Sequence, residues 1–187
     1  GNNITEEGVI RNRLEVDEGD PFNELLQAKS MNNIKSLNIF KSVDAEIVDG
    51  TDPSTKIINI NIEEKPTGEI SLGAGVGTDG GTMGFSVSEN NFLGKGVKLS
   101  TSIRLSETSV KGNFTVNNPN FNYTGRALNT NIESLTTDKL KDSGYKNTRT
   151  GVSIGTYFEE YENLYFSPKI SVFSETIDTD STASAAS

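Results

Sequence analysis

The chain has 187 residues, of which 33% are hydrophobic and 23% charged, and its net charge at pH 7 is −9. A chain this acidic is poorly suited to nucleic acid or to an anionic lipid surface as its main partner, because both attract basic proteins. It contains no Cys, His or Trp, so disulfides, thiolate metal sites and an imidazole base are excluded.

The sequence contains neither a transmembrane-helix signal nor a signal peptide. No apolar run approaches the roughly 18 residues of a transmembrane helix, and the start "GNNITEEG" is polar, unlike a signal peptide. Such a start fits a cytosolic protein or a piece of a longer exported precursor. The features described next favour the second interpretation.

Residues 1–66 are typical of a small α+β module. Thr5 is predicted to cap a first helix, and Asp20 to cap a second one with Pro21 as its first residue. The apolar residues at helical spacing are Val9, Ile10 and Leu14 in the first helix and Phe22, Leu25, Leu26, Ile34 and Leu37 in the second. We expect the second group to form a buried stripe.

A hairpin is predicted after the two helices. Alternation is seen at Val43, Ala45 and Ile47 and again at Ile58, Ile60 and Ile62, with the turn-forming residues 49–55 between them. Two helices and two strands make a thin core, so we expect a third strand upstream of Gly1.

The segment "EEKPTG" (63–68) marks a boundary, after which the pattern has a period of two residues throughout. Turn signals divide it into strands predicted at 69–78, 82–92, 96–106, 109–118, 125–136, 145–158 and 162–176. Consecutive strands joined by polar loops indicate an antiparallel meander.

Two environments are compatible with this alternation. A soluble β-rich adhesin or binding domain would turn the apolar face to a dry core, whereas a membrane barrel would turn it to lipid and the polar face to a wet lumen. Strands of about ten residues match the roughly 9–11 that cross a bilayer. The polar faces are also rich in Gly, Ser and Asn. These features favour the membrane.

Several motifs occur in one order: "GNNIT", "VIRNRLEVDEGDPFN", "LNIFKSV", "IEEKPTGEISLGAGVGTDGG" and "ENNFLGKG", all within about 1–96, followed by "NNPNF" at 117–121. In these the chain resembles the BamA family of outer-membrane-protein assembly factors. The resemblance implies an α+β POTRA module (1–66) without its first strand, then the N-terminal part of an antiparallel transmembrane β-barrel (67–187). About seven of the family's sixteen strands are visible. A VRGF-like loop motif is absent, so we expect an internal fragment.

The resemblance also implies a function. Family members catalyse no covalent step and need no cofactor; they fold and insert β-barrel proteins into the bacterial outer membrane, with the POTRA module in the periplasm. The implied partners are unfolded outer-membrane proteins, assembly-complex lipoproteins and outer-membrane lipid, with no nucleic acid. The alternative within the superfamily is a two-partner-secretion or related outer-membrane transporter.

Two strand edges are the candidate sites. By resemblance, the first barrel strand pairs with client strands at a seam that opens, and we call residues Glu69, Ile70, Ser71, Leu72, Gly73, Ala74, Gly75 and Val76 the client strand. Glycines within it are expected to weaken the seam; the alternative is that they only make room in the lumen. The second edge, the module edge, is Lys41, Ser42, Val43, Asp44, Ala45, Glu46 and Ile47, which by resemblance accepts an extended peptide. Its charged residues could equally protect a plain edge.

Overall fold

The computed structural model describes residues 1–52, 54–77 and 80–181. The chain divides into two compact units: the first contains Gly1–Thr67 and Asn90–Val97, and the second contains Gly68–Glu89 and the chain from Lys98 onward. In the described part of the chain, no helix has the length and apolar character needed to cross a membrane.

The first unit contains two helices, α1 (Glu7–Arg11) and α2 (Glu24–Ser36), and both predicted caps were wrong. Glu6 precedes α1 and makes no side-chain cap. Helix α2 starts after Asn23, whose Oδ1 accepts the N–H groups of two residues in the first turn at 2.9 and 3.1 Å. Asp20 instead accepts the Asp17 N–H at 3.0 Å and closes the preceding turn, so its carboxylate does not cap the helix.

The core of this unit is small. It consists of Val9, Ile10, Ile34, Ile39, Phe40, Val43 and Ile62. The stripe predicted on the second helix was largely wrong, because only Ile34 of that group is buried and Leu25 is 78% exposed. The inward positions of α2 are instead Gln27 and Ser30, which are buried. The Ser30 hydroxyl accepts the Glu15 N–H at 2.8 Å and so ties α2 to the preceding loop.

The predicted hairpin is present. Strand β1 (Phe40–Asp49) pairs antiparallel with β2 (Lys56–Glu64) in a two-stranded sheet, and Val43 lies opposite Ile62. Only this end of the hairpin is buried, since Ile47 near the turn is 44% exposed. Residue 53 of the predicted turn lies outside the described residues.

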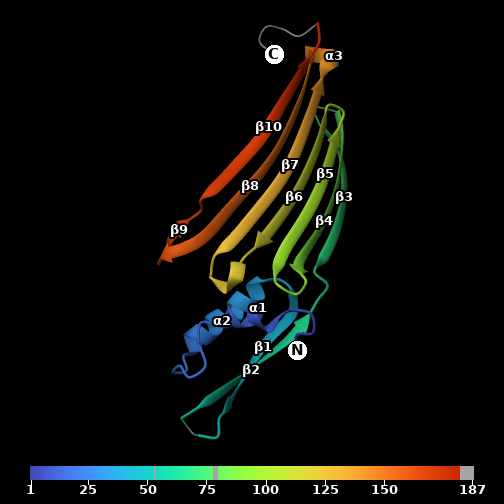
Figure 1. Ribbon diagram of the computed structural model, residues 1–187. Helices are drawn as coiled ribbons and strands as arrows, with labels where there is room; N and C mark the ends of the chain where they lie inside the picture. The colour runs from blue at the N-terminus through green and yellow to red at the C-terminus, as the bar shows by residue number, and fades with distance from the viewer. Residues whose placement is uncertain (53, 78–79, 182–187) are drawn as a thin grey trace. The chain divides into compact units, whose positions relative to one another are not determined.

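The second unit is one antiparallel sheet, drawn as long strands side by side in Figure 1. Its strands are β3 (Gly68–Gly77), β4 (Gly80–Phe92), β5 (Val97–Ser106), β6 (Ser109–Asn118), β7 (Ala127–Lys139), β8 (Tyr145–Tyr161), β9 (Leu164–Phe166) and β10 (Lys169–Thr179). They are ordered β10-β8-β7-β6-β5-β4-β3, with β9 paired to β8 alone. Among the described residues this sheet is open, and no closed barrel is formed.

Sequence and structure differ mainly in the last predicted strand and in two connections. The strand predicted at 162–176 is divided into β9 and β10 by Ser167 and Pro168, because proline cannot donate to a strand ladder. A 3₁₀ turn (η1, Phe121–Tyr123) joins β6 to β7, and a short helix (α3, Leu140–Ser143) joins β7 to β8. The turn predicted between the first two strands includes residues 78–79, which lie outside the described residues.

The apolar face of this sheet is uncovered. Leu72 is 79% exposed and Val172 is 70% exposed, and none of the described buried apolar core residues belongs to the sheet. A soluble sandwich would bury such a face beneath a second layer about 10 Å away. Within the described chain there is no second layer, so the face is free to meet another apolar phase.

Candidate functional site

The client strand lies in β3, at one edge of the sheet. Its only partner among the described strands is β4, with Leu72 opposite Phe85 and Gly73 opposite Gly84. Every residue of β3 is exposed. The N–H and C=O groups directed away from β4 are therefore available to another strand.

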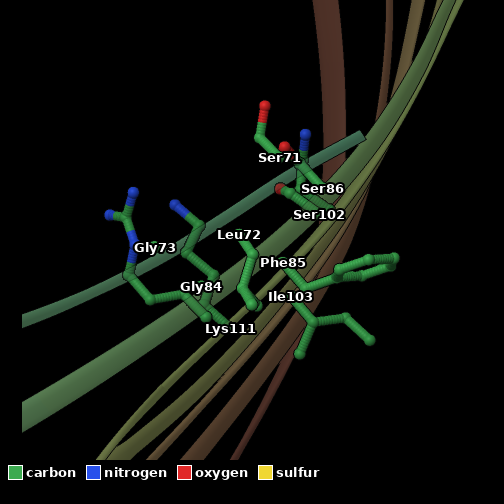
Figure 2. A pocket seen from close by; sticks show the side chains of 11 residues that line it. Ser71, Leu72, Gly73, Gly84, Phe85, Ser86, Ser102, Ile103 and Lys111 are labelled. Carbon is green, nitrogen blue, oxygen red and sulfur yellow. The ribbon is translucent and has the colours of Figure 1, made fainter. Parts of the chain in front are cut away.

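The glycine pair opens a hollow of about 500 Å³ beside this edge. No atom outside the local chain lies within 4 Å of where a Cβ on Gly73 would stand. Figure 2 shows Ser71, Ser86 and Ser102 on one side of the sheet and Phe85 and Ile103 on the other. The polar side is thus lined by hydroxyls and bare backbone over three strands, which leaves β3 with few side-chain contacts.

Two cationic side chains line the hollow on the side away from β3. Arg104 on β5 is directly opposite Lys111 on β6, and both line the hollow. No carboxylate among the described residues forms an ion pair with either side chain. The hollow therefore has a positive wall, although the chain as a whole is acidic.

The module edge lies within β1, whose only strand partner among the described residues is β2. Lys41, the first charged residue of this edge, forms an ion pair across the hairpin, with its Nζ 2.6 Å from Glu63 Oε1 on β2. Asp44 and Glu46 are exposed. The outer side of β1 is thus accessible to an extended peptide.

Sequence reasoning missed a carboxylate that organises the start of the chain. Glu64, the last residue of β2, accepts the N–H groups of Asn3, Ile4 and Thr5 at 2.8, 3.0 and 2.7 Å. Burial would raise the pKa of Glu64, but hydrogen bonds from Thr5, Asn3 and Ile4 outweigh it and lower that pKa to about 2. A glutamate at a strand end carries no signal of such a role in the sequence.

The β4–β5 turn belongs to the same unit, and although the turn itself was predicted, its contacts with the start of the chain were missed. Asn91 is buried; its Nδ2 donates to the Thr5 hydroxyl at 2.9 Å, and its Oδ1 accepts the Gly96 N–H at 2.7 Å. The Gly94 carbonyl accepts the Glu6 N–H at 2.8 Å. A Cβ on Gly94, whose φ is +73°, would lie 2.0 Å from the Ile4 carbonyl oxygen. The motif "ENNFLGKG" therefore joins the turn to the start of the chain.

Sequence comparisons identify relatives of both units. Residues 1–65 match the POTRA family, described as surface antigen variable number repeat. The outer membrane protein assembly factor BamA of Neisseria meningitidis serogroup B is 29% identical over 175 residues, which is 89% of this chain and 22% of the relative. BamA of Neorickettsia risticii is 32% identical over 119 residues, or 62% of this chain and 15% of the relative. The chain thus spans less than a quarter of these relatives.

Solved structures share the fold. A crystal structure of BamA from Haemophilus ducreyi lacking POTRA domains 1–3 superposes with a TM-score of 0.82 at 21% identity, covering 96% of this chain and 35% of that one. CdiB from Acinetobacter baumannii gives a TM-score of 0.63 at 13% identity, covering 93% and 36%. The expected arrangement, a POTRA module followed by a sheet of the BamA type, is confirmed.

Proposed function

We propose that this BamA-like chain, with a POTRA module in its first 65 residues, is part of a protein that folds and inserts β-barrel proteins into the bacterial outer membrane. The similarity to BamA over 89% of the chain carries this proposal. The POTRA module is periplasmic, and the sheet that follows is the start of a transmembrane barrel of sixteen strands. The boundary between them falls after residue 66.

The free edge of β3 supplies the mechanism. In hydrocarbon, each unpaired backbone N–H or C=O group costs several kcal/mol, so an incoming strand needs an edge on which to pair. The client strand offers such an edge, and its glycines reduce the side-chain contacts that would hold a seam closed. Unfolded outer-membrane proteins are thus the substrates, and assembly lipoproteins are partners of the complete protein.

Cysteine crosslinking in the full-length protein tests this mechanism. We expect Leu72→Cys, on β3, to form disulfides with cysteines in the strands of a client arrested during folding. Ile132→Cys is the matched control, because Ile132 is an exposed apolar residue on β7, which is paired on both sides. Equal crosslinking of the client to Leu72→Cys and Ile132→Cys, or no crosslinking to Leu72→Cys, would contradict pairing at β3.

Crosslinking at a further position distinguishes an assembly factor from a transporter, the alternative predicted from the sequence. A polypeptide that passes through the lumen would contact the polar face in the middle of the sheet. Asn113→Cys on β6 reports that contact, since Asn113 lines the polar hollow. Adducts at Asn113→Cys without adducts at Leu72→Cys would favour a transporter.

A further inference from the structure

A row of three side chains crosses β7, β8 and β9 at one end of the sheet. Arg126 immediately precedes β7, and the register of β7 with β8 brings it opposite Phe158, which in turn lies opposite Phe166. The Arg126 guanidinium lies over the Phe158 ring, 4.6 Å from its centroid, and the two phenylalanine rings stack at 5.9 Å. We call these three residues the arginine–aromatic row.

The row lies on the apolar face of the sheet. Side chains alternate along a strand, so Arg126 shares a face with Ile132 on β7, and Phe158 shares it with Val152 and Ile154 on β8. These three aliphatic side chains are between 44% and 49% exposed. A fully charged guanidinium at the end of an uncovered aliphatic band is a costly arrangement unless an anion or water reaches it.

Strand order fixes which end of the sheet this is. β3 starts at Gly68, directly after the module, and each following strand reverses direction, so β7 begins and β8 ends at the end where β3 begins (Figure 1). For a sheet that spans the outer membrane with its module in the periplasm, that end meets the inner, phospholipid leaflet. The row is then level with the headgroups.

The guanidinium has no anion within the described chain. Arg126 is exposed, and no carboxylate among the described residues forms an ion pair with it. An aromatic ring beneath a guanidinium leaves the N–H groups at its edge available, and guanidinium binds phosphate through paired hydrogen bonds. We propose that the arginine–aromatic row binds the phosphate of a phospholipid headgroup in the periplasmic leaflet.

Two variants separate lipid binding from a role in the sheet. Arg126→Gln removes the cation from the row. Arg149→Gln is the matched control, because Arg149 lies over Phe173 at 3.9 Å in a pair of the same kind, and strand alternation places that pair on the polar face. Phe158→Leu keeps an apolar side chain and removes the platform beneath the guanidinium.

The test uses the full-length protein in phosphatidylethanolamine vesicles that contain phosphatidylglycerol with a photoreactive headgroup. We expect the label on the peptide that contains Phe158 and Phe166. Arg126→Gln should lower it about fivefold, the factor expected of one basic side chain at a charged lipid surface. Phe158→Leu should lower it about two- to fivefold, and Arg149→Gln should leave it unchanged.

Two outcomes would overturn the proposal. Equal labelling of Arg126→Gln and the original protein means that the guanidinium reaches only water, and equal losses in Arg126→Gln and Arg149→Gln mean that both arginines merely support the sheet. A probe with its photoreactive group in the acyl chain confirms that each variant is inserted. The inference depends on the outer-membrane location and not on client folding, so a protein inactive in assembly would still give this result.

Discussion

At the scale of single residues, Glu64 shows how one carboxylate can hold a chain segment without an ion pair. It accepts three consecutive backbone N–H groups, from Asn3 to Thr5. Hydrogen bonds to an ionised acceptor are about twice as strong as those between neutral groups. The first residues of the chain are thereby joined to the end of β2, next to the start of β3.

We predict that Glu64→Gln in the full-length protein weakens this attachment by about 1–2 kcal/mol, less than the pKa shift alone implies because the site is partly exposed. Hydrogen exchange at neutral pH should show faster exchange of the Ile4 and Thr5 amides. Glu63→Gln is the control, since the neighbouring Glu63 side chain forms an exposed pair with Lys41. A similar change in both variants would refute a specific role for Glu64.

The same contact has a defined pH dependence. The pKa of Glu64 falls from 4.5 to about 2 on folding, so its contribution to stability is complete above pH 4.5 and is lost as the pH falls towards 2. Protection of the Ile4 and Thr5 amides, corrected for intrinsic exchange rates, should decline in that window. In Glu64→Gln, the part of the loss of amide protection that comes from protonation of Glu64 should be absent.

At the scale of elements, the two candidate edges belong to different units: β1 in the hairpin and β3 in the large sheet, whereas β2 and β10 are the opposite edges of those sheets among the described residues. The two candidate edges differ in composition. β1 carries Asp44 and Glu46, whereas β3 carries glycines at alternate positions from Gly73. Charge limits indiscriminate pairing at an edge, and this difference agrees with the proposed roles: brief contacts with extended peptides at β1 and strand pairing inside a membrane at β3.

We predict that Ala45→Pro or Ile47→Pro reduces binding of extended client peptides to the full-length protein severalfold, because proline removes a backbone donor from β1. Circular dichroism and a pull-down with a labelled client peptide measure folding and binding together. As a variant that keeps the backbone intact, Glu46→Cys should crosslink to a cysteine-containing peptide. Unchanged binding in folded proline variants, or no crosslink, would refute peptide addition at β1.

At the scale of the whole molecule, an acidic chain exposes a broad apolar sheet face. Ile70, Leu72 and Ile170 are each at least 70% exposed, and contiguous patches of this kind are rare on soluble monomers. The net negative charge favours water, whereas the exposed apolar face favours a nonpolar medium, so the chain requires both. Lipid on one face and water on the other satisfies both.

We predict that the full-length protein is monodisperse in detergent and aggregates when detergent is removed, because the apolar face then meets water. Light scattering before and after detergent removal measures this. Transfer into vesicles, the control, should preserve the monodisperse state. A detergent-free monomer that is freely soluble in water would overturn the membrane location and with it the proposed function.

The local sequence pattern was sufficient to predict most strands of the large sheet. Strands β3 to β8 were predicted because alternation with a period of two is a property of each segment by itself. The hairpin register, with Val43 opposite Ile62, follows from the same rule and a turn. Caps were not predictable in this way: Asp20 and Asn23 are both good N-cap residues, and the choice between them depends on which turn the preceding loop forms.

The sequence by itself therefore determined the strand periodicity, and it predicted the division into module and sheet and the two candidate edges. Only the tertiary structure decided that Glu64 binds the first residues, that Asn91 joins a sheet turn to Thr5, and that Arg126 lies over Phe158. The physical reason is the range of the interactions. Alternation arises between neighbours in the chain, whereas these contacts join residues 32 to 86 positions apart, and no local pattern specifies which distant partners will meet.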